Sequence, residues 1–148
     1  MTFSVTRRVE FRDTDAAGIV HFSAFFPMME SAEHELLRSV GIPILPVATG
    51  SAPALTWPRV SVACDYISAA RFEDVLQIHV RVIKIGNSSL QYGFEIVRDE
   101  QAIANGTMTT VCCQLAKDPA TGATHLEKSQ IPDSIRALLA PHVSPPES

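Results

Sequence analysis

The chain has 148 residues, of which 46% are hydrophobic and 19% charged, so it fits one domain that folds around a single core without disulfides or metals. This composition excludes disorder of the whole chain. Twelve basic residues against sixteen acidic ones give a net charge of −4, which argues against a nucleic-acid-binding protein.

The first third of the chain predicts one strand and one long helix. Residues 3–11 alternate roughly between apolar and polar types, as a strand does. Residues 23–40 place apolar side chains at steps of three and four, the period of an amphipathic helix, and Ser23 is expected to cap its start. Gly41 ends the helix, and the proline-rich segment 42–58 predicts a long loop or a short helical connection.

Four further strands are expected, each with alternating apolar residues or a high content of threonine and valine: 60–66, 76–82, 90–96 and 107–115. Turn-forming residues connect them, and short connections make neighbouring strands antiparallel. This order predicts an α+β fold in which the helix packs against one face of the sheet.

The remaining signals concern the ends of the chain and its cysteines. We expect a short helix within 132–139, a single domain over 1–140 and a flexible tail over 141–148. No stretch resembles a secretory signal or a membrane span, so a cytoplasmic protein is expected. Three cysteines at no metal-binding spacing indicate reduced, buried thiols, and no metal ion or cofactor is expected.

The segment 13–22 is the strongest candidate for a catalytic site, because two carboxylates and a glycine precede the start of the predicted helix. A helix start leaves backbone N–H groups unpaired, and these suit a developing oxyanion. A carboxylate held beside them can act as a general base or as a nucleophile on a carbonyl. Asp13 is expected to be structural, and an Asp-x-Asp pair before a helix is, on composition alone, more often turn chemistry and capping.

Residues 8–22, Arg-Val-Glu-Phe-Arg-Asp-Thr-Asp-Ala-Ala-Gly-Ile-Val-His-Phe, resemble the signature of the 4-hydroxybenzoyl-CoA thioesterase family. The similarity continues through the helix and extends weakly to about Leu115. It implies a hotdog fold, in which a five- or six-stranded antiparallel sheet wraps a long central helix. It also implies hydrolysis of an aromatic or short-chain acyl-CoA thioester by a homo-oligomer, a dimer or a tetramer of two dimers.

The resemblance assigns roles to individual residues. Asp15 matches the catalytic carboxylate, as nucleophile or general base, and the Phe22 N–H matches the oxyanion contact. Gly18 matches the glycine that lets the backbone turn close to the thioester. His21 stands where relatives usually carry Tyr or Trp, which places a titratable ring near the substrate.

Glu30 is the competing catalytic acid, because other hotdog branches place their carboxylate on the long helix. Glu30 and His34 are four residues apart and lie on one side of the helix. A surface pair or a dimer contact is the simpler interpretation, and a metal pair is weaker because the motif has no third ligand.

Trp57 and Val60 are expected to line an apolar, partly aromatic substrate pocket, and each is also an ordinary packing residue. The CoA part is expected to contact the turn between the third and fourth strands, through Lys84, Asn87, Ser88 and Ser89, which are also ordinary turn residues. Arg59 is a further candidate contact for the nucleotide phosphates. Three alternatives stay open: a 1,4-dihydroxy-2-naphthoyl-CoA thioesterase as the specific variant, a non-catalytic module that binds acyl-CoA or an acyl carrier, and a hotdog dehydratase that uses His21 with Glu30.

Overall fold

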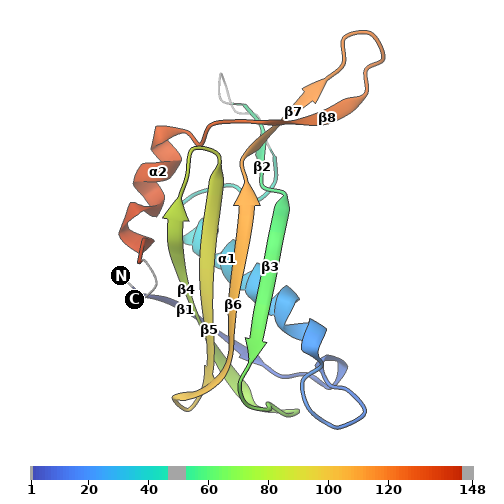
Figure 1. Ribbon diagram of the computed structural model, residues 1–148, viewed down its shortest axis with the longest axis vertical. Helices are drawn as coiled ribbons and strands as arrows, with labels where there is room; N and C mark the ends of the chain where they lie inside the picture. The colour runs from blue at the N-terminus through green and yellow to red at the C-terminus, as the bar shows by residue number, and fades with distance from the viewer. Residues whose placement is uncertain (1, 47–52, 145–148) are drawn as a thin grey trace.

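The computed structural model describes residues 2–46 and 53–144, and it places one long helix against a five-stranded antiparallel sheet (Figure 1). The helix, α1, spans Phe25–Ser39. The strands lie in the spatial order β1 (Phe3–Arg8), β4 (Val75–Ile85), β5 (Ser89–Arg98), β6 (Gln101–Val111) and β3 (Arg59–Tyr66). This α+β arrangement confirms the predicted hotdog fold, with five strands in the main sheet.

The alternating residues explain how the sheet covers the helix. On β4, Leu76, Ile78 and Val80 are buried beneath α1, and the residues between them point to the other face. The helix contributes Met29 to the same core. Gly106 on β6 permits this close approach, because a Cβ at that position would overlap the Met29 sulfur.

The strand β3 forms one edge of the main sheet. It pairs with β6 on one side, and the part of the chain that the structure describes provides no strand on the other side. Three large side chains of β3 stay exposed: Val60, Val62 and Tyr66. Unpaired backbone groups beside apolar side chains make this edge suited to pairing with another strand.

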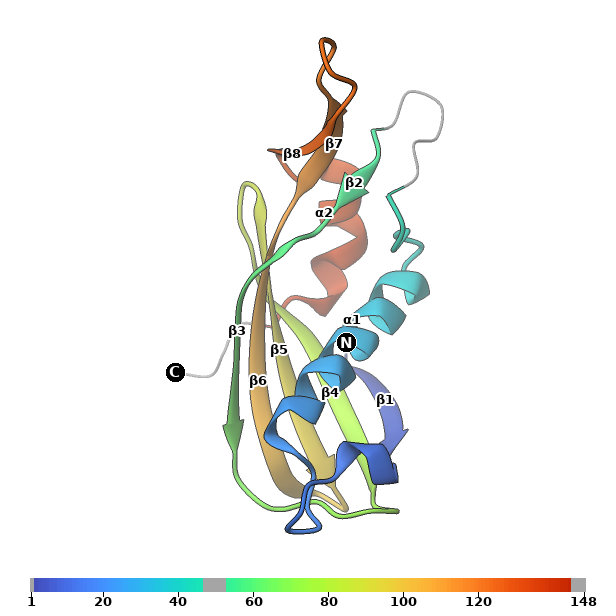
Figure 2. The ribbon, with the colours of Figure 1, turned by 90° about the vertical axis from the view of Figure 1, so that its right-hand side faces the viewer.

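A second, three-stranded sheet extends beyond the end of the main sheet (Figures 1 and 2). It consists of β2 (Leu55–Thr56), β7 (Cys113–Lys117) and β8 (Thr124–Lys128). The strand expected over 107–115 is therefore wrong as a single element, because β6 ends at Val111 and β7 begins at Cys113. Between them the Cys112 N–H donates to the Ser88 carbonyl over 2.7 Å, which ends the regular pairing with β5.

The C-terminal segment runs beside β4 beyond the end of its pairing with β1, and its Leu139 joins the core. Helix α2 (Asp133–Leu139) leads into a 3-10 helix over Ala140–His142, and His142 is buried. The Ser144 N–H then donates to the Val82 carbonyl over 2.8 Å. This differs from the flexible tail expected from residue 141 onward, and residues 145–148 lie outside the described residues. In the described part of the chain, no helix is long and apolar enough to cross a membrane.

Candidate active site

Asp15 lies in a tight turn that precedes α1. Its Oδ1 accepts hydrogen bonds from the Ala17 N–H at 2.8 Å and the Ile19 N–H at 3.4 Å. Gly18 closes the turn with φ +80°, a left-handed conformation that favours glycine. Among the described residues, nothing donates a hydrogen bond to Oδ2. The turn therefore fixes the Asp15 carboxylate by one oxygen and leaves the other available.

Asp13 has a structural role, as expected. Its Oδ2 accepts a hydrogen bond of 2.8 Å from the Glu10 N–H and caps the 3-10 helix Phe11–Asp13. Its carbonyl oxygen accepts a bond of 2.7 Å from the His21 N–H. Asp13 thereby ties the Asp15 turn to the start of the helix.

A 3-10 helix over Phe22–Ala24 leads into α1, and His21 caps it. The His21 Nδ1 accepts a hydrogen bond of 3.2 Å from the Ser23 N–H and lies 2.7 Å from the Ser23 hydroxyl. The prediction that Ser23 caps the long helix is therefore wrong, because Ser23 lies inside this 3-10 helix and the N-cap position of α1 is Ala24, which provides no side-chain hydrogen bond. No hydrogen bond in the described part of the chain uses the Phe22 N–H, the first donor of the 3-10 helix.

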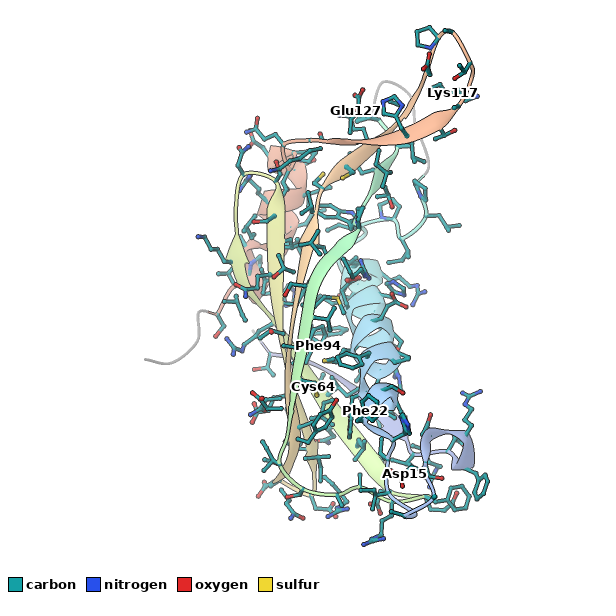
Figure 3. The ribbon with its side chains drawn as sticks, turned by 45° about the vertical axis from the view of Figure 1, so that its right-hand side comes forward. Asp15, Phe22, Cys64, Phe94, Lys117 and Glu127 are labelled. Carbon is teal, nitrogen blue, oxygen red and sulfur yellow. The ribbon has the colours of Figure 1, made fainter. Side chains whose placement is uncertain are left out.

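Asp15 and the helix start face a common cavity of about 330 Å³. Its walls are largely apolar, and they come from the Asp15 turn, the start of α1, the end of β3 and the loop after it: Asp15, Ile19, Val20, Phe22, Phe25, Tyr66, Ile67, Ser68, Ala69 and Ala70. Figure 3 shows Asp15 and Phe22 near each other at the end of the molecule where α1 begins. The cavity thus has at its wall both a residue with a free carboxylate oxygen, Asp15, and a residue with an unpaired N–H, Phe22.

Comparison with known proteins decides the family. The sequence model of the Thioesterase-like superfamily matches residues 9–139. The chain belongs to the Thioesterase-like superfamily. The fold and the family resemblance predicted from the sequence are thereby confirmed, and thioester hydrolysis is its class of reaction.

Individual relatives agree with this thioesterase assignment. The 1,4-dihydroxy-2-naphthoyl-CoA hydrolase of Nostoc punctiforme is 28% identical over 91% of this chain and 84% of its own. The acyl-CoA thioesterase YbgC of Haemophilus influenzae is 25% identical over 78% of this chain and 83% of its own. The crystal structure of a 1,4-dihydroxy-2-naphthoyl-CoA thioesterase from Synechocystis superposes with a TM-score of 0.78 at 24% identity, over 95% and 96% of the two chains.

The middle of α1 in this thioesterase carries a buried ion pair that the sequence did not predict. Arg59 Nη2 donates to Glu33 Oε1 over 3.0 Å and lies 2.8 Å from Oε2, outside hydrogen-bonding geometry. Glu33 is 1% exposed, and this burial raises the pKa of its carboxyl while Arg59 opposes the rise. The one signal in the sequence was a carboxylate on the apolar face of the helix, four residues after Met29.

Several predicted substrate residues gather around this ion pair, away from Asp15. The Glu30 carboxylate is half-exposed and lies 3.5 Å from Arg59 Nε. Arg59 also donates to the Trp57 carbonyl over 2.7 Å. His34, Glu33 and Arg59 border a cavity of about 180 Å³. Desolvation lowers the pKa of the His34 ring. Within one chain, Arg59 is the centre of this cluster, and Glu30 is not brought to the Asp15 cavity.

The hairpin between β4 and β5 also lies at the opposite end of the main sheet from Asp15 (Figure 1). Much of its backbone is used within the chain, since Arg136 donates to the carbonyls of Gly86 at 2.6 Å and Asn87 at 3.1 Å. Ser88 is buried and Ser89 half-buried, whereas the side chains of Lys84 and Asn87 are exposed. Arg136 was not predicted, because nothing near it in the sequence marks its contact with this turn.

A larger hollow of about 580 Å³ lies on the other face of the main sheet. Polar side chains dominate its lining, and its guanidinium, Arg81, already donates to the Ser144 carbonyl over 2.9 Å. Neither the Asp15 carboxylate nor the helix start borders it. Its size therefore does not make it the reaction site.

Proposed function

We propose that this protein hydrolyses acyl-CoA thioesters with Asp15 as the acting carboxylate. One observation carries the proposal: the same apolar cavity is bordered by Asp15, which has a free carboxylate oxygen, and by Phe22, which has an unpaired N–H. Relatives named acyl-CoA thioesterase and 1,4-dihydroxy-2-naphthoyl-CoA hydrolase support the substrate class. An acyl group enters the cavity with its thioester carbonyl between these two groups.

Two routes use the same atoms. In the first, an Asp15 oxygen attacks the thioester carbon, the tetrahedral intermediate expels the CoA thiolate, and water hydrolyses the resulting mixed anhydride. In the second, Asp15 removes a proton from water while the water oxygen attacks, and that proton passes to the departing sulfur. In both routes the Phe22 N–H donates to the oxyanion, and losing one such donor typically costs about 10²–10³ in rate.

The walls of the cavity support an aromatic or short aliphatic acyl group. The Phe25 and Tyr66 rings lie 5.7 Å apart between centroids and offer flat apolar surfaces. Val20 and Ile67 complete an apolar lining that favours acyl groups without charge. The 1,4-dihydroxy-2-naphthoyl group is one aromatic candidate of this kind.

We further propose that two chains pair through the open edge of β3. A two-fold axis across two antiparallel β3 strands brings the Arg59 end of one strand beside the Tyr66 end of the other. The partner's Arg59 and the partner's Trp57 then approach the Asp15 cavity, which brings together the substrate residues that one chain keeps apart. A tetramer of two such dimers and a cytoplasmic location stay predictions from the sequence.

The test is thiol release from a panel of aromatic and aliphatic acyl-CoAs, with wild type beside Asp15→Asn. Removing the carboxylate at nearly constant size is expected to lower kcat by about 10²–10⁴ while acyl-CoA binding is retained. Asp13→Asn is the matched control, since it makes the same change two residues away at a structural position. Glu30→Gln tests the competing acid.

The outcomes separate the alternatives. Full activity in Asp15→Asn, with loss in Glu30→Gln, moves the catalytic role to the helix. Binding of acyl-CoA without thiol release by wild type indicates a non-catalytic binding module. Hydration of a crotonyl-type thioester without thiol release indicates a dehydratase.

A further inference from the structure

Two side chains hold the peptide bond between Phe22 and Ser23. Its carbonyl oxygen accepts a hydrogen bond of 2.8 Å from the Tyr66 hydroxyl. Its N–H donates to the His21 Nδ1 over 3.2 Å. The peptide that directly follows the Phe22 N–H is therefore fixed at both of its polar atoms.

The Phe22 side chain itself provides little anchoring. It is 62% exposed and stacks on the neighbouring His21 ring, with the ring centroids 4.4 Å apart. The backbone at Phe22 is instead fixed by bonds on either side, including the Ala24 N–H that donates to the His21 carbonyl over 2.9 Å. The direction of the Phe22 N–H thus depends on these backbone contacts and not on packing of the Phe22 ring.

Tyr66 connects this peptide to the sheet. It is the last residue of β3, 44 residues away in the sequence, and its ring packs near Phe25 at the wall of the Asp15 cavity. Partial desolvation raises the pKa of the Tyr66 phenol, so the hydroxyl keeps its proton and stays a donor at neutral pH. Among the hydrogen bonds that the 22–23 peptide makes with residues 2–46 and 53–144, the Tyr66 bond alone comes from the sheet.

We propose that Tyr66 is a positioning residue for thioester hydrolysis, because its hydroxyl binds the Phe22 carbonyl and thereby keeps the Phe22 N–H directed at the developing oxyanion. This inference rests on the proposed function. The transition state gains from the fixed N–H more than the bound substrate does, since negative charge develops on the oxygen only as the tetrahedral species forms. Loss of the Tyr66 hydroxyl is therefore expected to lower kcat more than it changes KM.

The chain offers a matched control, because its two tyrosines are Tyr66 and Tyr92. Tyr92 is fully buried on β5, away from the Asp15 cavity. Tyr66→Phe keeps the ring and removes one hydroxyl, and it is expected to lower kcat by about tenfold, less than the loss of a whole oxyanion donor. KM and Tm are expected to stay close to wild type, and Tyr92→Phe is expected to keep the wild-type kcat. An unchanged kcat in Tyr66→Phe, or an equal loss in Tyr92→Phe, overturns the proposal.

A second measurement distinguishes positioning from a purely structural contact. In the Tyr92→Phe background, fluorotyrosine incorporation changes the acidity of Tyr66 alone. At a pH where the phenol stays protonated, a positioning hydroxyl makes kcat vary steadily with phenol acidity. Hydrogen exchange at the Ser23 amide is also expected to accelerate in Tyr66→Phe. A kcat that does not respond to fluorination, or an unchanged Ser23 exchange rate, counts against the role.

Failure of this inference differs from failure of the proposed function. If wild type hydrolyses acyl-CoA and Asp15→Asn does not, while Tyr66→Phe matches wild type, then hydrolysis at Asp15 stands and the role of Tyr66 falls. If wild type releases no thiol from any acyl-CoA, then both fall.

Discussion

One carboxylate, Asp15, lies before the start of α1 and another, Glu33, lies near its middle, and the two differ in burial and in their partners. At the start of the helix, Asp15 is held by one oxygen, and the Phe22 N–H has no acceptor among the described residues. Near the middle of the helix, Glu33 is buried and paired with Arg59, which also binds the Trp57 carbonyl, and the two atoms without a hydrogen bond, Glu33 Oε2 and Arg59 Nε, are buried within this ion pair. A free carboxylate oxygen at a half-buried position, and not a buried ion pair, marks the site that is equipped for chemistry.

The same difference predicts where stability is concentrated. A buried ion pair contributes little compared with an apolar pair of similar size, but loss of one partner leaves an uncompensated charge in the core. The Asp15 end is half-exposed, and water replaces lost contacts there. Substitution of Asp15 is therefore expected to lower activity more than stability, whereas substitutions in the Glu33–Arg59 pair are expected to lower stability first.

The largest stability effect is expected from breaking the buried pair. Arg59→Met leaves the Glu33 carboxyl buried without its partner, and it is expected to lower the free energy of unfolding by about 3–5 kcal/mol. Glu33→Leu is expected to cost less, because Arg59 is partly exposed and still lies beside Glu30. The double variant replaces the pair with apolar side chains, and its loss of stability is expected to be smaller than that of Arg59→Met. Urea unfolding of all four proteins measures this coupling. A double variant whose loss equals the sum of the single losses contradicts an interacting pair.

A smaller effect of the same pair concerns pH. Burial raises the pKa of Glu33 in the folded state above its ordinary value of 4.5, so the folded protein holds this proton more tightly than the unfolded chain does. The free energy of unfolding is therefore expected to fall as pH rises from 4.5 toward the folded pKa, by up to about 1.4 kcal/mol per pH unit.

Unfolding curves over this pH range are the measurement. Glu33→Gln is expected to remove this part of the slope, whereas Glu30→Gln is expected to keep most of it, because burial is the largest cause of the raised pKa of Glu33 and the nearby Glu30 charge the smallest. A slope of the opposite sign, or one that Glu33→Gln leaves intact, excludes Glu33 as its source.

The Asp15 end could be predicted because its parts are contiguous in the sequence. Asp15, Gly18 and Phe22 lie within eight residues, and a turn followed by a helix start brings them together through local backbone geometry. The main sheet was predictable for the same reason, since alternation along β4 and β5 depends on each strand alone.

The features that could not be predicted depend mostly on contacts between residues far apart in the sequence. Arg59 lies 26 residues from Glu33, and a single carboxylate on an apolar helix face does not identify its partner. The division of β6 from β7 follows from the bond between Cys112 and Ser88, which alternation does not reveal. Ser23 was expected to cap the long helix, yet a 3-10 helix that the sequence did not predict precedes α1, contains Ser23 and is capped by the His21 ring.

The smallest effect is expected at Gly18, where substitutions test whether the Asp15 turn requires glycine for its backbone conformation alone. Gly18 has φ +80°, and a Cβ built there meets no atom within 4 Å. Gly18→Ala is therefore expected to lower the free energy of unfolding by about 1 kcal/mol through backbone strain without a clash. Gly18→Asn is expected to lower the free energy of unfolding less than Gly18→Ala does, because Asn adopts this left-handed conformation more readily than Ala. Urea unfolding measures both variants. A larger loss of stability in Gly18→Asn than in Gly18→Ala indicates that limited space, and not backbone conformation, is the reason for glycine in this turn.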